Sequence, residues 1–393
     1  MPWPIPKLIT IQRPNPISLR KWLPAVVAVA AGCAVAVLKL WPSGKSTQTA
    51  LFWGLLIGAP TAAVCLLFGW RLNRWEQEQL IAEESQHEKK RIETLWRNWC
   101  RRNLPIAEVA VFLPQKVDAA KLGDADAELP VNTNRSAGFD WTKDKPVEQR
   151  RKDLLGFIVT RLRDGLSGLH EIALTLILDE ASFADQATWE AETKEAFEQA
   201  LKGVDFNVEA VLATDCAKWI AGHIDVDGLP ARLVVAIQSW RGEEEQVFSE
   251  AAAAILFASR PAGFAREGAL SAPVVGHVLR PVTTGEETLK DDLSQIVAMQ
   301  VAPDKLTHVW LTGCSEAFGT ATLTALNSPE NKVIDRLVDS IIGLPGPLRG
   351  WIALSIALEM GKSLPGPQLV VWRDAGRNST QMCVVASGEM DEN

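Results

Sequence analysis

Tyrosine is absent from this sequence of 393 residues, and histidine occurs only five times. Cysteine is sparse as well, and no two of the six cysteines show a spacing that is typical of a metal site or of a disulfide framework. Zinc-ribbon and small disulfide-rich domains are therefore excluded. We expect free thiols in a reducing compartment at Cys33, Cys65, Cys100, Cys216, Cys314 and Cys383.

The sequence also lacks an excess of positive charge and the usual nucleotide or hydrolase motifs. Its net charge is -8, and basic residues cluster only beside two apolar runs, which argues against a nucleic-acid partner. There is no G-x-S-x-G elbow. The residues Ser43-Gly44-Lys45-Ser46 are like the end of a phosphate-binding loop, but Lys39 stands where that motif needs its first glycine.

Two long apolar runs are present near the N-terminus. Residues 1–21 are basic and contain five prolines, so we expect an extended tail. Trp22 to Leu40 and Leu51 to Trp70 are each long enough for a bilayer core of about 30 Å, and residues 22–70 therefore predict a transmembrane hairpin. Tryptophans mark the ends of the runs, as interfacial aromatics do: Trp22, Trp41, Trp53 and Trp70.

The distribution of basic residues predicts the orientation of this hairpin. The link between the runs has only Lys45, whereas the tail has four cations and the segment from Arg71 to Arg91 has five. By the positive-inside rule both ends of the hairpin face the cytoplasm. A signal peptide and a soluble helical hairpin are the alternatives; the second run and the lack of a clear cleavage site weigh against the first.

The rest of the chain alternates helix and strand patterns. Residues 71–103 are charged and predict a helical stalk, and 387–393 form a tail. Between them lies an α/β domain, 104–386, whose predicted long loop covers 114–150. The predicted strands cover 106–113, 170–178, 207–213, 233–238, 249–257, 274–282 and 308–311, and the predicted helices cover 151–166, 187–202 and 286–301.

The C-terminal part of this domain has the most informative pattern. Trp351 to Met360 is a run rich in Ile, Leu and Ala that follows three glycines, Gly343, Gly346 and Gly350, which predicts a buried helix in close contact with a neighbouring backbone. Strand patterns follow at Gln368 to Trp372 and Gln381 to Val385. The chain is thus predicted to end as buried helix, strand, turn and strand.

This order resembles the C-terminal half of the thiolase / β-ketoacyl synthase superfamily. Residues 343–350 match the outer glycines of its G-H-S-x-G-A-A-G segment, and residues 375–379 resemble its G-G-x-N-x-S turn. The resemblance covers residues 104–386, with halves of about 104–282 and 283–386. It implies a thiolase-like αβαβα layered domain and a possible homodimer through the first half.

The residues that carry the family's chemistry are replaced. A decarboxylating ketoacyl synthase needs a thiolate at a helix N-terminus and two side chains, usually imidazoles, that bind the thioester or carbanion oxygen. The positions equivalent to the two histidines hold Thr312, in the segment 309–319, and Leu344. Cys216 lies near the nucleophile position, but its helix is predicted to be too short, and Cys314 follows a strand. We expect both to be structural thiols.

We therefore expect no catalytic, cofactor-binding or metal residues, and predict a pseudoenzyme. The resemblance extends to degenerate, membrane-anchored proteins associated with type VI secretion effectors and spike proteins. It implies an adaptor or chaperone in a bacterial inner membrane, with its N-terminus and domain in the cytoplasm and a secreted protein as its partner. Two alternatives stay open: an acyl-thioester enzyme that uses Cys216 or Cys314, and a structural scaffold in which the hairpin is the functional part.

Overall fold

The chain is divided into two compact units in a computed structural model. One unit comprises Met1–Pro4 with Arg97–Asn393, and the other comprises Ile5–Trp96. The structure describes residues 3–4, 11–142, 144–213, 215–241, 247–259, 273–327, 333–374 and 379–388.

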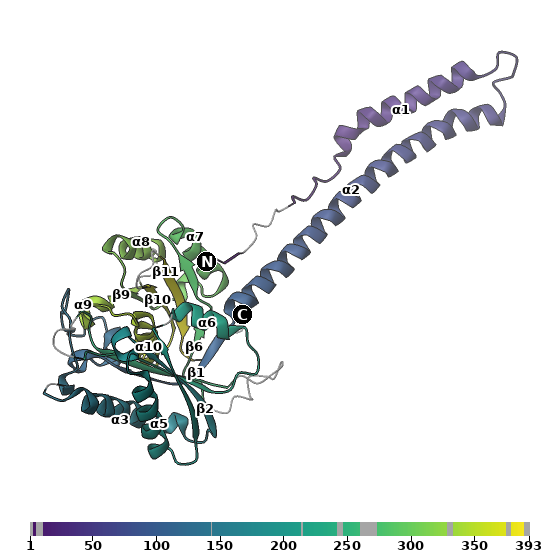
Figure 1. Ribbon diagram of the computed structural model, residues 1–393. Helices are drawn as coiled ribbons and strands as arrows, with labels where there is room; N and C mark the ends of the chain where they lie inside the picture. Colours follow the sequence, from purple (N-terminus) through teal and green to yellow (C-terminus); the bar gives the residue numbers. More distant parts are fainter. Residues whose placement is uncertain are drawn as a thin grey trace. The chain divides into compact units, whose positions relative to one another are not determined.

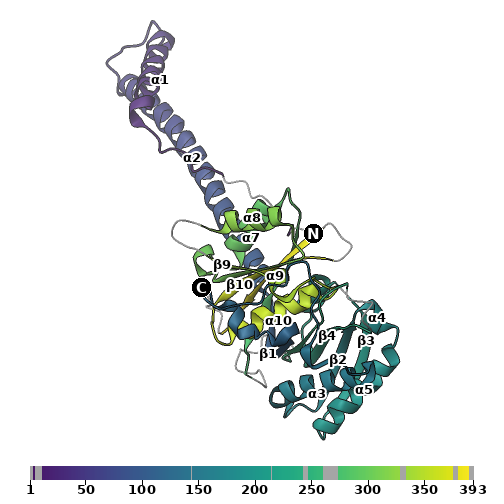
Figure 2. The same ribbon diagram turned by 90° about the vertical axis from the view of Figure 1, so that its left-hand side faces the viewer.

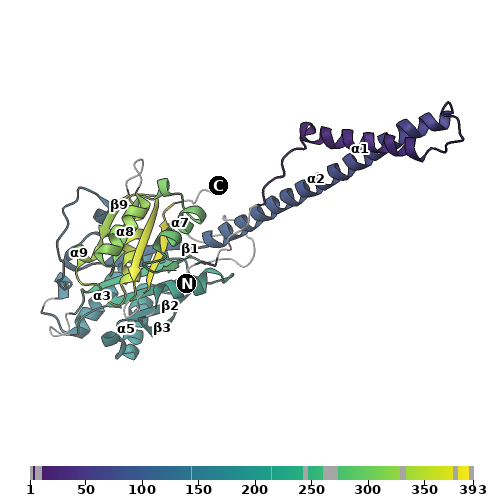
Figure 3. The ribbon, with the colours of Figure 1, turned by 90° about the horizontal axis from the view of Figure 1, so that it is seen from above.

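The Ile5–Trp96 unit is built from two helices that run side by side (Figures 1 and 3). Helix α1 spans Leu19–Leu40, and α2 spans Ala50–Arg101 and so continues into the other unit. The second apolar run and the charged segment form one helix because no glycine or proline interrupts residues 71–101. Both helices are long and apolar enough to cross a membrane. The Ser43–Ser46 segment lies in the turn between them.

The larger unit contains a sheet in the order β3-β2-β4-β5-β1-β6-β11-β10-β8-β9, with β7 paired to β11. Its strands are β1 (Asn103–Phe112), β2 (Glu171–Leu178), β3 (Asp205–Leu212), β4 (Arg232–Gln238), β5 (Ala251–Phe257), β6 (Gly276–Leu279), β7 (Val282–Thr284), β8 (His308–Thr312), β9 (Ile334–Leu337), β10 (Pro367–Arg373) and β11 (Thr380–Ala386).

The two halves of this sheet repeat one topology. In the first half β3, β2 and β4 are parallel, and β5 is antiparallel to both β4 and β1. In the second half β9, β8 and β10 are parallel, and β11 is antiparallel to both β10 and β6. If the strands of each half are numbered from one to five, with β7 set aside, both halves read 3-2-4-5-1. The antiparallel pair of β1 and β6 joins them.

Helices cover the strands in layers (Figure 2). The helices of this unit are α3 (Val147–Leu166), α4 (Glu180–Phe183), α5 (Gln186–Ala200), α6 (Cys216–Ile224), α7 (Leu289–Met299), α8 (Glu316–Leu326), α9 (Val338–Ile342) and α10 (Arg349–Gly361). Helices α3 and α5 pack on the first half through one apolar core. A second core contains α6 and α10, and α10 contacts β1 and β5 on one side and β8, β10 and β11 on the other.

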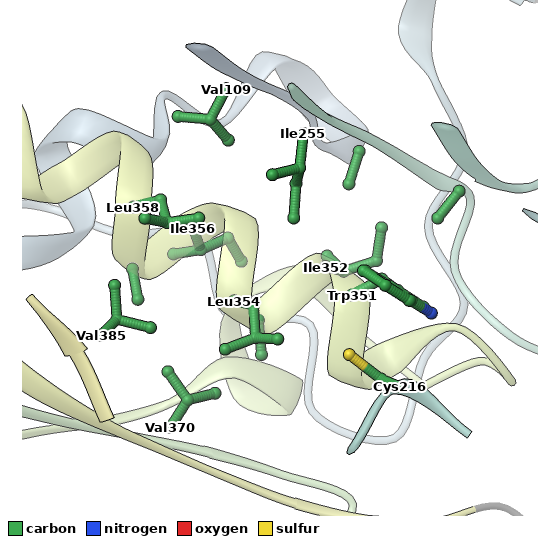
Figure 4. Close-up of a cluster of buried hydrophobic side chains, with 14 of the residues drawn as sticks. Val109, Cys216, Ile255, Trp351, Ile352, Leu354, Ile356, Leu358, Val370 and Val385 are labelled. Atoms are coloured by element: carbon green, nitrogen blue, oxygen red, sulfur yellow. The ribbon is translucent and has the colours of Figure 1, made fainter. Parts of the chain in front are cut away.

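Helix α10 is the buried helix that the apolar run predicted (Figure 4). Apart from Arg349, Ser355 and Glu359 its side chains are apolar, so it is stable only where strands of both halves cover it. Gly350 permits the close approach of β10: a β-carbon there would lie 2.7 Å from the indole nitrogen of Trp372. The flanking strands β10 and β11 agree with the predicted runs within two residues.

Some local predictions differ from the structure. After the strand 308–311 no helix was predicted from the sequence, but α8 begins at Glu316. Strand β9 and helix α9 were not predicted. The predicted loop 114–150 contains three short 3-10 turns, η1 (Pro114–Lys116), η2 (Ala119–Gly123) and η3 (Asp140–Thr142), and ends where α3 begins. The turn residues 375–378 lie outside the described residues.

Candidate functional site

The candidate site lies where strands of both halves end and the central helices begin. Helix α6 connects β3 to β4 in the first half, and α9 and α10 connect β9 to β10 in the second. The repeated topology therefore makes α6 the counterpart of α10. Cys216 is the first residue of α6, so it occupies the helix N-terminus that a nucleophilic thiol of this fold would need.

The thiol of Cys216 is buried rather than presented. Only 3% of the residue is exposed, and it belongs to the same apolar cluster as Trp351 of α10 (Figure 4). Burial raises the pKa of Cys216 well above its ordinary value, and the negative charge of Asp215 and Asp374 raises it further. Asp215 also caps the helix, accepting a hydrogen bond from the Lys218 amide at 3.1 Å. The thiol is therefore protonated at neutral pH.

The helix that carries Cys216 has nine residues, compared with thirteen in α10. Gly222 lies inside it, and it ends at Ile224 with Asp225 as its C-cap. This agrees with the sequence analysis, which predicted a helix of about two turns. A short helix has fewer aligned peptide dipoles and offers less stabilisation to a thiolate at its start.

Thr312, at the first histidine position, is held by a carboxylate from another element. Its hydroxyl donates a hydrogen bond of 2.6 Å to Asp339 of α9, and the Gly313 amide donates one of 2.6 Å to the other carboxylate oxygen. Gly313 has a φ of 65°, and a β-carbon there would lie 2.5 Å from Nη1 of Arg349, so glycine is favoured at this position. Thr312 thus uses its proton in a structural hydrogen bond, and its hydroxyl is too weak a base to take up a proton as an imidazole does.

Asp339 and Arg349 were not singled out from the sequence. Burial raises the pKa of Asp339 and lowers that of Arg349, and the attraction between the two opposite charges works against both shifts. Arg349 also donates a hydrogen bond of 2.8 Å from Nε to the Gly346 carbonyl oxygen. An arginine at the start of a largely apolar helix was the signal that could have found this pair.

Leu344, at the second histidine position, is fixed through its backbone. Its amide donates to the Arg135 carbonyl oxygen at 2.9 Å, and its carbonyl accepts from the Ser249 amide at 2.9 Å. The preceding Gly343 has a φ of 93°, which favours glycine. These two hydrogen bonds connect the backbone of this loop to the first half of the domain. The Leu344 side chain itself can neither accept a proton nor stabilise an oxyanion.

Cys314 is half-buried and lies beside the most polar of the described cavities near this site. The cavity has a volume of about 200 Å³ and is lined by Glu286, Cys314, Ser315, Phe318, Arg373 and Thr380. The thiol donates a hydrogen bond of 3.5 Å to the Thr312 carbonyl oxygen. Burial, together with the charge of Asp339, raises the pKa of Cys314 to about 12. Ser315 caps the following helix α8.

The histidines serve local structure. His223 bonds the Trp219 carbonyl oxygen and Arg232, His277 bonds Asn103, and His308 bonds the Gly123 carbonyl oxygen. His87 and His170 are exposed. In the part of the chain that the structure describes, no cluster of three or more His, Cys, Asp or Glu side chains is arranged to hold a metal ion. The acidic residues 243–245, which the sequence predicts to be a solvated loop or, alternatively, a docking surface for a basic partner, lie outside the described residues.

No family model matches this chain, and no curated protein matches it in sequence. Solved structures similar to it include peroxisomal 3-ketoacyl-CoA thiolase of Saccharomyces cerevisiae, with 13% identity, a TM-score of 0.46, and coverage of 73% of this chain and 98% of that chain. OleA of Xanthomonas campestris bound to cerulenin has 17% identity, a TM-score of 0.44, and coverage of 74% and 98%. FabH, 3-oxoacyl-(acyl carrier protein) synthase III of Pseudomonas aeruginosa, has 12% identity, a TM-score of 0.43, and coverage of 74% and 100%.

The activities named for these enzymes are theirs, and the shared feature is the fold. The yeast thiolase is described as a five-layered α-β-α-β-α structure built from two core domains of identical topology. In this chain the 3-2-4-5-1 strand order occurs twice, and the central helices α6 and α10 share one apolar core. On the grounds of its own topology, this chain has the mixed α/β, thiolase-like layered fold that the sequence predicted, and two apolar helices that are candidates for a membrane hairpin come before it in the sequence.

Proposed function

We propose that this chain is a catalytically inactive thiolase-like protein that is anchored in a bacterial inner membrane and holds a protein partner on the cytoplasmic side. The observation that carries the proposal is the state of the former catalytic positions. The Cys216 thiol is buried with a raised pKa, and Thr312 and Leu344 supply no imidazole. The protein keeps the folded domain, whose surface can bind a partner.

The two apolar helices support the membrane anchor. Little of their apolar surface is buried inside the protein: in the apolar stretch of the first helix 0% of the residues are buried, and in that of the second helix 11% are buried. A core helix of a soluble protein would bury this surface. Here, by contrast, large apolar side chains are exposed along both helices. They include Leu23, Val27, Val35, Leu38, Leu40, Leu51, Ile57 and Leu66. The basic residues at both ends of the hairpin favour a cytoplasmic domain.

The class of partner is inferred from the resemblance to degenerate thiolase-like proteins of type VI secretion clusters. Such a partner would be a secreted effector or a spike component, which the chain would hold as an adaptor or chaperone. A protein that has lost its catalytic groups but keeps a folded domain next to a membrane is suited to such a role.

The test is a pull-down of the tagged full chain from its native host in mild detergent, followed by mass spectrometry. A secreted toxin or spike protein at near-stoichiometric yield is the expected result. A matched preparation carrying Cys216→Ser should recover the same partner, because the thiol has no part in binding. Recovery of acyl carrier protein or coenzyme A species, without a protein partner, would overturn the adaptor.

The second candidate is an acyl-thioester enzyme that uses Cys314 or Cys216. Cys314 is the better candidate for the nucleophile, because it lines a cavity whereas Cys216 is buried. The enzyme requires a thiol that reacts with iodoacetamide faster than an ordinary cysteine at neutral pH. Alkylation of the folded chain, read by peptide mass spectrometry with Cys314→Ser as the control, distinguishes this enzyme from the adaptor, for which both thiols stay unmodified.

A further inference from the structure

The third residue of the chain is buried against the larger unit. Trp3 is only 5% exposed, although it lies at the very start of the sequence. Its indole nitrogen donates a hydrogen bond of 3.3 Å to the Pro281 carbonyl oxygen. Its ring meets the ring of Trp99 edge to face, with centroids 6.3 Å apart and planes at 83°. Both the apolar ring and the polar N–H of Trp3 are thus satisfied.

The surface that receives Trp3 is held in place by its own contacts. The guanidinium of Arg280 lies 3.8 Å from the centroid of a Trp99 ring, and its Nε donates to the Trp99 carbonyl oxygen at 3.1 Å. Arg280 is 5% exposed and is paired with Asp225. Because these contacts do not involve Trp3, the socket formed by Trp99, Arg280 and Pro281 exists independently of its occupant.

The sequence around Trp3 favours docking. Pro2 and Pro4 flank it, and proline restricts the conformations of the free chain, so that less entropy is lost when the segment is ordered. Met1–Pro4 belongs to the same compact unit as Arg97–Asn393, whereas the intervening Ile5–Trp96 forms the other unit. The chain therefore leaves the larger unit after Pro4, the residue that follows Trp3, and re-enters it at Arg97, two residues before Trp99.

We propose that Trp3 is an anchor and that the socket of Trp99, Arg280 and Pro281 is its binding site, so that the helical hairpin is tied to the domain at both ends. The docking itself does not depend on the proposed function. One consequence rests on the proposed membrane anchor: the N-terminus and the domain then lie on the same side of the membrane, and the hairpin crosses it an even number of times.

The test places the photo-cross-linker p-benzoylphenylalanine at position 3 of the full chain, expressed in the membranes of its native host. We expect a cross-link within one chain, to peptides that contain Trp99 or Pro281. In a Trp99→Ala background the yield should fall about tenfold, because the aromatic contact and its buried surface are lost. A Trp141→Ala background, which removes an aromatic residue packed against Phe139 and Phe157, should leave the yield unchanged.

Thermal unfolding of the Trp99→Ala chain separates loss of docking from loss of folding. A tenfold lower yield with a cooperative unfolding transition supports the anchor. Cross-links only to lipid, to other copies or to other peptides would overturn it, as would an unchanged yield in Trp99→Ala. The readout does not require a partner or an activity, so failure of the adaptor proposal leaves this result interpretable, and the reverse also holds.

Discussion

At the scale of the residue, two effects act on the Cys216 thiol in opposite directions. A helix N-terminus stabilises a thiolate by about 0.3–1 kcal/mol, which is less than one pKa unit. Complete burial can raise a pKa by about 3–5 units. Burial therefore outweighs the helix, in agreement with the raised pKa of Cys216. The absence of imidazoles at Thr312 and Leu344 is then a second difference from a reactive site, in addition to a thiol that is already protonated and buried.

Because burial dominates, we can predict what happens when the two histidines are restored. Replacing Thr312 and Leu344 by histidine should not create decarboxylase activity on a malonyl thioester above the rate without enzyme, because the Cys216 thiol stays buried in the apolar cluster that contains Trp351. Release of carbon dioxide measures the activity, and Leu344→Phe provides a control for the change of side-chain size. A rate at least about tenfold above that control would mean that the imidazoles alone were missing.

The buried and half-buried histidines make a prediction about pH. Burial lowers the pKa of His223, His277 and His308, so the folded chain favours their neutral forms. His223 is the clearest case: its Nδ1 donates to the Trp219 carbonyl oxygen at 2.8 Å, and its Nε2 must then accept from Arg232 at 2.7 Å. A proton on Nε2 would replace that hydrogen bond by repulsion between two cations.

Below about pH 6.5 the unfolded chain takes up these protons more readily than the folded chain does, so stability is complete above that pH and falls as the pH falls. We expect the thermal midpoint to drop by several degrees between about pH 7.5 and about pH 5.5. His223→Gln, which cannot be protonated, should show a smaller drop. Equal drops in the two proteins would contradict the role of His223.

At the scale of the element, strand β3 is an edge strand that the chain partly protects. The amide of Asp205 bonds the His170 carbonyl oxygen and that of Ala213 bonds the Leu178 carbonyl oxygen, so odd-numbered amides face β2 and even-numbered ones face outwards. The outward amide of Ala210 donates a hydrogen bond of 2.8 Å to the Glu190 carboxylate of α5. A charged side chain on an edge amide hinders pairing with another strand.

Removing this protection should strengthen self-association. A symmetric strand pair would gain one backbone hydrogen bond from each chain in Glu190→Ala, which corresponds to association about tenfold tighter. Glu190→Gln keeps an acceptor oxygen and should behave like the natural chain. Sedimentation in detergent measures the effect. A natural chain that already dimerises as tightly as Glu190→Ala would support the homodimer implied by the resemblance and contradict protection by Glu190.

Two glycines, Gly343 in the loop after α9 and Gly156 inside α3, should respond to alanine with opposite changes in the free energy of unfolding. A β-carbon at Gly343 would lie 2.3 Å from the Arg135 carbonyl oxygen, and the residue has a φ of 93°, so Gly343→Ala should destabilise the fold by about 3 kcal/mol. Gly156 is inside α3 with nothing within 4 Å of such a carbon, so Gly156→Ala should stabilise by about 0.5–1 kcal/mol. Thermal unfolding with opposite shifts is expected, and a neutral Gly343→Ala would contradict the close approach.

The elements that could be predicted from the sequence are those whose pattern is local. Strands β2, β4 and β5 and helix α10 are runs of apolar residues bounded by polar ones or glycine, and each was found within two residues of its bounds. Strand β9 escaped prediction because its four residues, Ile-Asp-Arg-Leu, show no alternation of apolar and charged side chains and form too short a stretch.

The candidate site was predictable only in part. The assignment of Thr312 and Leu344 to the two histidine positions is implied by the resemblance to the superfamily, and the short helix after Cys216 follows from the breakers Gly222, Asp225 and Gly228. The Asp339–Thr312 hydrogen bond and the apolar cluster shared by Cys216 and Trp351 join residues that are distant in sequence, and neither pair has a motif. Such contacts depend on how the two halves pack, which no local pattern specifies.

At the scale of the whole molecule, the hairpin and the domain can be tested separately. In the adaptor proposal the domain binds the partner and the hairpin only fixes its location. In the scaffold alternative the hairpin itself is the functional part. Residues 104–386 hold the repeated sheet and both apolar cores, so we expect this part to keep its fold when residues 1–70 are removed.

Deletion of residues 1–70 should therefore move the protein to the soluble fraction while the partner still co-purifies with near-stoichiometric yield. The expected loss is in location, because the exposed apolar helices are gone and the domain surface is not. A matched chain, in which an unrelated apolar hairpin of equal length replaces residues 22–70 and the tail is kept, should stay in the membrane and bind the same partner. If that chain reaches the membrane, folds cooperatively and yet recovers no partner, the specific sequence of α1 and α2 carries the function, and the scaffold replaces the adaptor.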